Sequence, residues 1–293
     1  MSQTEVWTIG RLLTWTTDYL KQQGSDSPRL DAEVLLAKAK GCPRIQLYTA
    51  FDQPADDATR TTFRELVKKR AEGMPVAYLV GQREFFSLSF RVTPDVLIPR
   101  PETETLVVRL IDLVNDRLVQ SDDLQIADIG AGSGIIAVTV AKHLPNARVT
   151  AVDLSPAAIA VATQNATVHG VSDRIEFIES DLFANVPAER TFDIIASNPP
   201  YVSEPEFAKL ARSVRDFEPR MALVGGSNGT EVIERLVEQA ESRLRQNGWL
   251  LMEVSPMIEP AVIELLSRRA IFETHPTLKD SAGLPRIVQA KRI

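Results

Sequence analysis

The sequence contains a single cysteine, Cys42, so an internal disulfide is excluded. This residue stands between Gly41 and Pro43 at the expected end of a helix, which favours a structural role over a nucleophilic one. The three histidines are scattered along the chain, and their spacing gives no zinc-binding cluster. We therefore predict a protein of the reducing cytoplasm that carries no metal ion.

Long apolar runs are missing as well. No stretch of the sequence reaches the roughly 20 consecutive apolar residues that a membrane-spanning helix needs. The first residues also lack the basic segment and the apolar core of a signal peptide. The sequence therefore predicts no membrane association.

An excess of basic residues is the third absence. The 293 residues carry 33 Lys and Arg against 39 Asp and Glu, which gives a net charge of −6 with His neutral. The charge is uneven, with a net +1 in residues 1–75 and a net −7 in residues 76–293. Proteins that bind bare phosphate backbone usually present a basic patch, so this balance argues against nucleic acid as a partner without excluding it.

Residues 1–75 have a helical pattern. Apolar residues recur at helical spacing around residues 12–20, and the pattern returns in the segments 28–40, 44–49 and 57–72. Four short helices with short connections predict a small bundle, and we assign it to an N-terminal domain of residues 1–75.

Residues 76–98 are rich in β-forming side chains, with Gly81 and Pro94 as turn signals. We predict that 76–80 and 85–92 form the strands of a β-hairpin. This hairpin would link the helical domain to the rest of the chain.

Residues 99–293 form the third predicted region. A helix is expected to begin at Pro101 or Thr103 and to run through Leu118. From residue 125, strand and helix patterns alternate, which predicts a mostly parallel, doubly wound α/β sheet. The last two strands have a connection too short for a helix, so they should pair antiparallel. The strands are predicted at 125–129, 147–153, 174–179, 192–197, 248–254, 271–275 and 285–290, and the helices at 134–144, 156–169, 229–246 and 258–269.

A glycine-rich turn follows the first strand of this region. Glycines there allow positive φ and let a ligand approach the backbone, and the next helix offers free N–H groups. The dinucleotide fingerprint G-x-G-x-x-G needs glycine where Ile135 stands, so the turn departs from that pattern. A tight turn that binds nothing stays open as an alternative. The turn comprises Asp128, Ile129, Gly130, Ala131, Gly132, Ser133 and Gly134.

Three acidic residues at strand ends indicate which ligand the turn would take. Asp153, about twenty residues after the glycines, suits a ribose hydroxyl. Asp128 favours S-adenosylmethionine over NAD, because a carboxylate matches an ammonium and repels a pyrophosphate. Asp181 could accept from an adenine amino group, with Leu182 or Phe183 packed on the ring. The alternative for Asp181 is a helix N-cap.

The fourth strand runs into a turn of sequence Asn198-Pro199-Pro200-Tyr201. Prolines lack an N–H but keep their carbonyls, and Asn198 adds a side-chain oxygen. The turn is thus a rigid cluster of acceptors beside an aromatic ring, which suits a planar NH2 group. Accepting both hydrogens would return electron density to a poorly nucleophilic nitrogen and aim its lone pair at a methyl carbon.

These motifs together resemble a class I S-adenosylmethionine methyltransferase that acts on an sp2 amino nitrogen. Residues 81–85, 98–104 and 217–219 narrow the resemblance to the peptide chain release factor glutamine N5-methyltransferases, the PrmC/HemK family. The resemblance covers essentially the whole chain. It implies a Rossmann-like, seven-stranded sheet with an antiparallel last strand. It also implies methylation of the glutamine in the Gly-Gly-Gln motif of class I release factors.

The resemblance carries roles over to particular residues. Gly130 to Gly134, with Ala131 and Ser133, and Asp153 would lie at the cofactor. Asn198 and the Pro199 carbonyl would accept from the substrate amide, next to Pro200 and Tyr201. Arg100 and Glu102 match the family's loop and are expected near the substrate. Leu182 stands where some members carry tryptophan beside the adenine.

Other functions remain open at this point. A related subfamily methylates glutamine on a ribosomal protein, and the same turn serves DNA or RNA amino-methyltransferases. A non-catalytic adaptor is a further alternative, against which the presence of Asn198 argues. We expect a release factor as the protein partner, docked by the helical domain, no direct nucleic-acid contact, and a monomer.

Overall fold

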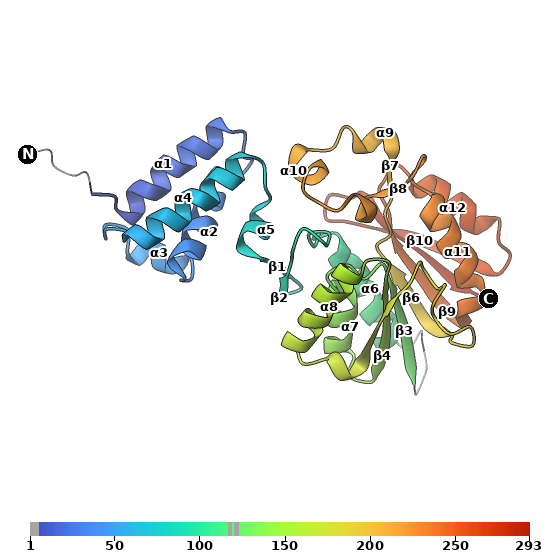
Figure 1. Cartoon of the computed structure of the whole chain (residues 1–293). Helices are drawn as coiled ribbons and strands as arrows, with labels where there is room; N and C mark the ends of the chain where they lie inside the picture. Colours follow the sequence, from blue (N-terminus) through green and yellow to red (C-terminus); the bar gives the residue numbers. More distant parts are fainter. Residues whose placement is uncertain (1–5, 117–118, 120–122) are drawn as a thin grey trace, which may run out of the picture. The chain divides into compact units, whose positions relative to one another are not determined.

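The computed structural model describes residues 6–116, 119 and 123–293. The chain forms two compact units, which are labelled along the chain in Figure 1. The helical unit consists of the chain up to Gly81 together with Arg212–Phe217, and the sheet unit consists of Gln82–Ala211 and Glu218–Ile293. In the part of the chain that the structure describes, no helix combines the length and the apolar character needed to cross a membrane.

In the helical unit, four helices lie at the predicted places. They are α1 (Ile9–Gln22), α2 (Pro28–Lys40), α3 (Ile45–Thr49) and α4 (Asp57–Ala71). A side-chain cap starts α4, because the Asp56 carboxylate accepts from Thr59 N at 2.7 Å. Leu13, Leu35 and Phe63 from three of these helices are buried in one core. The predicted bundle is confirmed.

The predicted first strand of the hairpin is wrong, because residues 76–80 form helix α5 (Val76–Val80). Val76, Leu79 and Val80 have the i, i+3, i+4 spacing of a helix face, and they pack against the core of the helical unit. Gly81 then ends the helix with a positive φ of 78°. A short apolar run fits a strand or a helical turn equally well in sequence, and packing decides between them.

A β-hairpin follows directly and belongs to the sheet unit. Strands β1 (Gln82–Phe85) and β2 (Leu88–Arg91) pair antiparallel. The two residues that connect them have positive φ, 51° at Phe86 and 58° at Ser87, as a two-residue hairpin turn requires. The expected hairpin is therefore present, but it is shorter and begins later than predicted.

The sheet unit is built on a seven-stranded sheet of order β10-β11-β9-β6-β3-β4-β5. From β9 through β6, β3 and β4 to β5 all neighbours pair in parallel, whereas β11 is antiparallel to both β9 and β10. This topology confirms the predicted doubly wound sheet with its antiparallel last strand. The strands are β3 (Leu124–Ile129), β4 (Ala147–Asp153), β5 (Ile175–Glu179), β6 (Phe192–Ser197), β9 (Leu244–Glu253), β10 (Phe272–Lys279) and β11 (Pro285–Arg292).

Helices cover both faces of the sheet (Figure 1). Alternate strand residues face the two layers, so Ile126 packs with one group of helices and Ala127 with the other. One face carries α6 (Thr103–Asn115), α7 (Ile135–His143) and α8 (Pro156–Val168), and the other carries α11 (Glu231–Arg243) and α12 (Glu259–Ser267). The structure ends α6 at Asn115, and its expected end at Leu118 lies outside the described residues.

Short elements between β6 and α11 were not predicted. Strand β7 (Val202–Ser203) pairs with β8 (Val224–Gly226), and the 3-10 helix η2 (Arg220–Ala222) comes just before β8. A Cβ atom at Gly225 would stand 2.3 Å from the Pro200 carbonyl oxygen, so only glycine lets β8 pass so close to the proline turn. These elements form part of the surroundings of the candidate site.

Candidate active site

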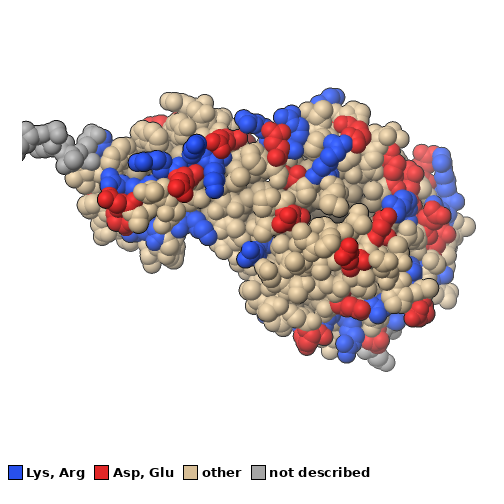
Figure 2. Space-filling model, in the orientation of Figure 1, with Lys and Arg blue, Asp and Glu red and all other residues tan. Residues whose placement is uncertain are grey.

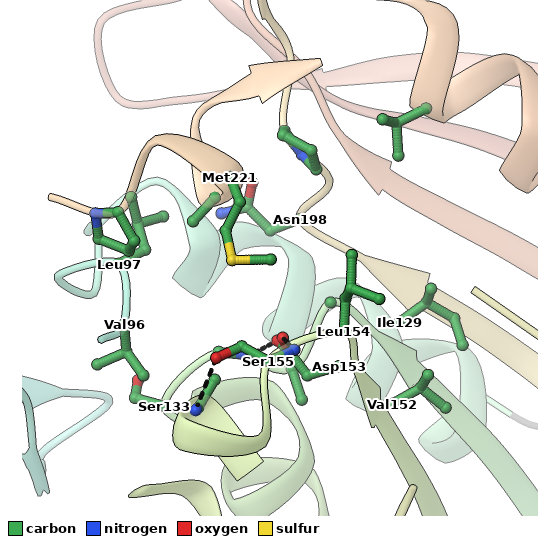
Figure 3. Close-up of a pocket in the computed structure, with 18 of the residues that line it drawn as sticks. Val96, Leu97, Ile129, Ser133, Val152, Asp153, Leu154, Ser155, Asn198 and Met221 are labelled. Atoms are coloured by element: carbon green, nitrogen blue, oxygen red, sulfur yellow. Dashed lines mark hydrogen bonds between the residues drawn. The ribbon is translucent and has the colours of Figure 1, made fainter. Parts of the chain in front are cut away.

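A cavity of about 350 Å³ opens where the parallel strands of the sheet unit end. In doubly wound folds this edge, beside the point where the strand order reverses, is where ligands bind. Figure 3 shows Asp153, Ser155 and Ser133 on one side of the cavity and Asn198 and Met221 across from them. The two predicted motifs, the glycine turn and the Asn-Pro-Pro-Tyr turn, thus line one site.

The glycine turn between β3 and α7 is held by hydrogen bonds to β4. Gly130 N and Ala131 N both donate to Val152 O, at 2.8 and 2.9 Å. Gly132 has a φ of 55°, and a Cβ atom there would meet nothing within 4 Å. The backbone of the turn is therefore fixed in position, and Gly132 lines the cavity without a side chain.

Helix α8 supports the same turn from behind. A Cβ atom at Gly134 would lie 3.0 Å from Ala162 Cβ, so glycine lets α7 and α8 pack closely. The buried Asn165 side chain donates to Ser133 O at 2.8 Å and accepts from Arg91 N at 2.8 Å. It therefore ties the turn to the hairpin, a role that no local motif announces.

Asp153 ends β4 and lines the cavity. Its Oδ2 accepts from Gly132 N at 2.8 Å, and its Oδ1 accepts from Ser155 N at 2.9 Å. Burial raises the pKa of this carboxyl, and the two N–H donors oppose that shift. A carboxylate offers about four lone-pair positions, so each oxygen keeps capacity for a hydroxyl in the cavity.

Asp128 lies beneath the turn and is not among the residues that line the cavity. Its side chain is fully buried, and Oδ2 accepts from Ala137 N in the first turn of α7 at 3.0 Å. Oδ1 has no hydrogen-bond partner among the described residues. Burial raises the pKa of Asp128 to about 7, and the nearby charge of Asp153 adds to the rise. Asp128 thus stabilises the first turn of α7, and its expected contact with a ligand ammonium stays a prediction.

The three residues after β5 take three different positions. Asp181 lines the cavity, but its carboxylate also accepts from Arg235 Nη2 at 2.7 Å, with both side chains half exposed. Leu182 lines the cavity with a positive φ of 50°. Phe183 is buried in the core against Phe192 and does not line the cavity, which leaves Leu182 of the two residues expected against the ring.

The Asn-Pro-Pro-Tyr turn continues β6 into the cavity wall. Asn198 and Pro200 line the cavity, Pro199 is buried, and Tyr201 packs against the core behind the turn. Burial and the negative charge of Glu253 raise the pKa of Tyr201 above its ordinary value, so its phenol stays protonated. Asn198 and Pro200 are therefore the two residues of the turn that reach the cavity.

Glu218 fixes the proline-stiffened loop before α6. Its buried carboxylate accepts from Arg100 Nη2 at 2.6 Å and from Ile98 N at 3.1 Å. Arg100 lines the cavity, whereas Glu102 does not and lies 3.9 Å from Arg286. Only one of the two loop residues expected near the substrate therefore faces the cavity.

The structure brings most of the predicted site residues to the cavity and leaves the others outside its lining. The lining includes Arg100, Gly130, Ala131, Gly132, Ser133, Asp153, Asp181, Leu182, Asn198 and Pro200. The predicted residues outside the lining are Glu102, Asp128, Gly134, Pro199 and Tyr201.

Sequence reasoning missed two features of the site. Val96, Leu97 and Met221 add apolar wall to the cavity, with Met221 contributed by the unpredicted 3-10 helix η2. Behind Asn198, the buried Thr103 and Glu253 side chains are joined by a 2.6 Å hydrogen bond. Thr103 lies in the loop motif and Glu253 lies in a predicted strand, but nothing local marks them as partners.

The charge around the site is mixed. In the view of Figure 2, acidic and basic side chains lie interspersed over the sheet unit. Within the described residues, no group of three or more His, Cys, Asp and Glu side chains is placed to hold a metal ion.

Family models match both parts of the chain. The model described as the PrmC N-terminal domain matches residues 11–81, and the model described as the methyltransferase small domain matches residues 111–214.

Curated relatives match nearly the full length. The release factor glutamine methyltransferase of Rhodopirellula baltica is 49% identical over 286 residues, which is 98% of this chain and 97% of the relative. The protein of the same name from Geobacter sulfurreducens is 39% identical over 284 residues, 97% of this chain and 96% of the relative.

Solved structures share the fold at low identity. The hMettl16 catalytic domain, solved in complex with a MAT2A 3'UTR hairpin, is 19% identical with a TM-score of 0.57 and covers 78% of this chain and 82% of that one. The T. thermophilus RsmC methyltransferase, solved with AdoMet and guanosine, is also 19% identical with a TM-score of 0.50, covering 72% of this chain and 50% of that one. At such identities the likeness concerns the fold alone.

Proposed function

The chain belongs to the family of the release factor glutamine methyltransferases, and from this premise we propose that it methylates the side-chain amide nitrogen of a glutamine in class I peptide chain release factors. The glutamine is the one in the Gly-Gly-Gln motif. The single observation that carries the proposal is that the Asn-Pro-Pro-Tyr turn and the glycine turn line one cavity. The enzyme is thus an S-adenosylmethionine-dependent methyltransferase.

The residues of the cavity fit S-adenosylmethionine. When bound, this cofactor supplies a methyl group on a positively charged sulfur and leaves as a neutral thioether. Asp153 keeps acceptor positions for the ribose hydroxyls, and the bare backbone at Gly132 lets the ligand approach closely. Leu182 offers an apolar wall for the adenine ring. A carboxylate at the ribose and an apolar adenine wall are the features that this group requires.

The substrate amide would be held by acceptors. We place the Asn198 Oδ1 and the Pro199 carbonyl oxygen on the two amide hydrogens, because the two prolines offer no N–H that would compete. Because both N–H hydrogens are bound by acceptors, electron density returns to the nitrogen, whose lone pair is otherwise delocalised into the carbonyl, and the lone pair is oriented. Orientation of this kind can lower the activation barrier by several kcal/mol. No general acid is needed, because the leaving group is neutral. The nitrogen forms its new bond to the methyl carbon as the carbon–sulfur bond breaks, and it then releases one of its two hydrogens as a proton to water.

The helical unit would dock the release factor. Residues of helices α1 and α4 line a groove of about 500 Å³. Two of its aromatic residues are stacked, Trp15 on Tyr19, with ring centroids 5.2 Å apart. Arg64 and Lys68 from α4 also line the groove. Thr16 lines it too, with a buried hydroxyl that has no hydrogen-bond partner among the described residues.

This groove fits an acidic, amphipathic segment of a protein partner. Half-exposed aromatic rings are frequent anchors of protein interfaces, and the cationic side chains would meet carboxylates at the rim. We therefore place the release factor's docking segment on the groove of the helical unit, while its glutamine reaches the cavity of the sheet unit.

One experiment separates this function from its alternatives. The full-length protein is incubated with methyl-labelled S-adenosylmethionine and, in parallel, with a class I release factor, total ribosomal protein and duplex DNA. We expect label on the release factor alone. Label on a ribosomal protein or on DNA would assign one of the alternative substrates instead.

We also propose a cellular compartment and an oligomeric state for the enzyme. A substrate of the translation machinery and the single cysteine support action in the cytoplasm, and we propose a monomer there. Sedimentation of the purified protein at micromolar concentration tests the monomer.

A further inference from the structure

A chain of two hydrogen bonds leads from the cavity into the core. Asn198 Nδ2 donates to Thr103 Oγ1 at 3.2 Å, and Thr103 Oγ1 donates to Glu253 Oε2 at 2.6 Å. Thr103 is 0% exposed and Glu253 is 1% exposed. The three residues come from the turn after β6, from the start of α6 and from the end of β9, so the fold rather than a local motif joins them.

The bonding rules of these groups fix which way the Asn198 amide points. An ionised carboxylate can only accept, so the Thr103 hydroxyl must give its one hydrogen to Glu253. The hydroxyl oxygen can then only accept from Asn198, and the amide must turn its NH2 group toward Thr103. The Asn198 Oδ1 is left for the cavity, where an acceptor is wanted.

We propose that Thr103 and Glu253 are positioning residues for methyl transfer, which hold the Asn198 amide with its oxygen toward the substrate nitrogen. The inference rests on the proposed function, because the acceptor role of Asn198 is part of it. Neither residue touches the cavity, so their effect passes entirely through Asn198.

The reverse orientation would oppose the reaction. If Glu253 were protonated, its O–H could donate to Thr103, and the Thr103 hydrogen would become free to donate to the Asn198 oxygen. The Asn198 amide could then turn over and present its NH2 group to the NH2 group of the substrate. Two donors would face each other, and the substrate lone pair would lose its orientation.

The surroundings of Glu253 make this protonation accessible near neutral pH. Burial is the main cause that raises the pKa of Glu253 to about 7. The hydrogen bond from Thr103 and the positive charges of Arg100 and Arg286 lower it, whereas the negative charge of Glu102 raises it. The Tyr201 phenol, which stays protonated, also faces this carboxyl.

The first test removes the hydroxyl without changing the shape of the side chain. For Thr103→Val we expect kcat on the release factor to fall about tenfold or more, the equivalent of one lost orienting hydrogen bond, with unchanged affinity for S-adenosylmethionine. Thr103→Ser restores the hydroxyl and should recover most of the turnover. A Thr103→Val enzyme with wild-type kcat would overturn the inference, as would a failure of the serine variant to recover while it still binds cofactor normally.

The second test uses the pH profile. Wild-type kcat should fall as pH drops below about 7, where Glu253 takes up a proton. Glu253→Gln cannot titrate, so its profile should lose this acid limb and lie at a lower plateau. Asp128→Asn is the matched control, because among the described residues Asp128 is the other buried carboxyl with a pKa raised to about 7, and its carboxylate accepts from Ala137 N.

The controls distinguish a failure of the positioning role of Glu253 from a failure of the proposed function. The Asp128→Asn enzyme should keep the acid limb even if its overall activity is lower. If the limb persists in Glu253→Gln and vanishes in Asp128→Asn, the positioning role of Glu253 is wrong. If wild-type protein does not methylate the release factor at all, the proposed function itself has failed.

Discussion

Single polar residues around the cavity divide their hydrogen-bonding capacity between the protein and the space that they face. Asp153 uses one position on each oxygen for the N–H groups of Gly132 and Ser155, and Asn198 uses its Nδ2 for Thr103. The partners behind each side chain hold it in place, and the remaining acceptors face the cavity. Acceptors fixed in this way cost little reorganisation when a ligand arrives.

Asp153→Ala should weaken the binding of S-adenosylmethionine about 10- to 100-fold, because hydrogen bonds to a charged group contribute about 1.5–3 kcal/mol. Isothermal titration calorimetry measures the affinity. Asp181→Ala is the comparison, since the Asp181 carboxylate is half exposed and already pairs with Arg235, and it should lose less. Unchanged affinity in Asp153→Ala would show that this carboxylate does not hold the ribose.

Asp128 should make the stability of the protein depend on pH. Its folded-state pKa of about 7 lies above the ordinary value of 3.8, so the native state binds the proton more tightly than the unfolded chain does. The free energy of unfolding should therefore fall as pH rises from about 4 to 7. Asp128→Asn lacks this titration, so relative to wild type its stability should gain on the order of 2 kcal/mol between pH 5 and pH 8. Urea unfolding at both values measures it, and parallel wild-type and variant profiles would contradict the role of this buried carboxyl.

Local sequence motifs predicted individual site residues but not the side chains that hydrogen-bond to them in the folded protein. The turn at Asn198 and the acid at Asp153 could be found because their chemistry follows directly from strand ends. The bond between Thr103 and Glu253 joins residues 150 positions apart, and only the folded sheet brings them together. Asp128 ends the same kind of strand as Asp153, and no sequence pattern tells which carboxylate faces the cavity.

Elements were predicted best where the hydrophobic period is long and unbroken. All seven strands of the large sheet and the helices that cover it lie within a few residues of the predicted ranges, with β9 and β10 the most extended beyond them. Residues 76–80 were placed in a strand because five apolar residues carry no distinct period. Strands β7 and β8 were missed because elements of two or three residues depend on pairing with a distant segment.

Close packing between α7 and α8 should make Gly134 sensitive to substitution. Gly134→Ala adds a Cβ atom 3.0 Å from Ala162 Cβ at a φ of 80°, so both overpacking and backbone strain oppose it. We expect a loss of about 2–4 kcal/mol in the free energy of unfolding. Gly170→Ala is the matched control, because it has a φ of 68° with nothing within 4 Å and should lose only about 1 kcal/mol. Equal losses in the two variants would show that packing at Gly134 contributes nothing.

The two units of the chain would have different roles, methyl transfer in the sheet unit and docking of the substrate protein in the helical unit. The sheet unit holds the cavity and the acceptors, and the helical unit carries the aromatic groove. The net charge also divides, with −7 on residues 76–293 and +1 on residues 1–75. Recognition by a docking groove would explain how an enzyme that binds one glutamine side chain could select a whole protein.

Trp15→Ala should therefore separate docking from chemistry. Trp15 is 52% exposed and lines the groove together with Tyr19, on which its ring stacks. We expect kcat/KM on the intact release factor to fall about 10- to 30-fold, as for an interface anchor, with no change on a short Gly-Gly-Gln peptide. Ile45→Ala removes an exposed apolar side chain outside the groove and should change neither rate. Equal losses on factor and peptide would place the effect of Trp15 outside docking.

The most direct measurement of the central claim is tandem mass spectrometry of a class I release factor after incubation with methyl-labelled S-adenosylmethionine and either the wild-type enzyme or Asn198→Ala. With the wild type we expect one labelled methyl group on the side-chain nitrogen of the Gly-Gly-Gln glutamine. With Asn198→Ala we expect the loss of most turnover, while cofactor affinity largely survives. A methyl group on any other residue, or near wild-type kcat without the Asn198 side chain, would contradict the central claim.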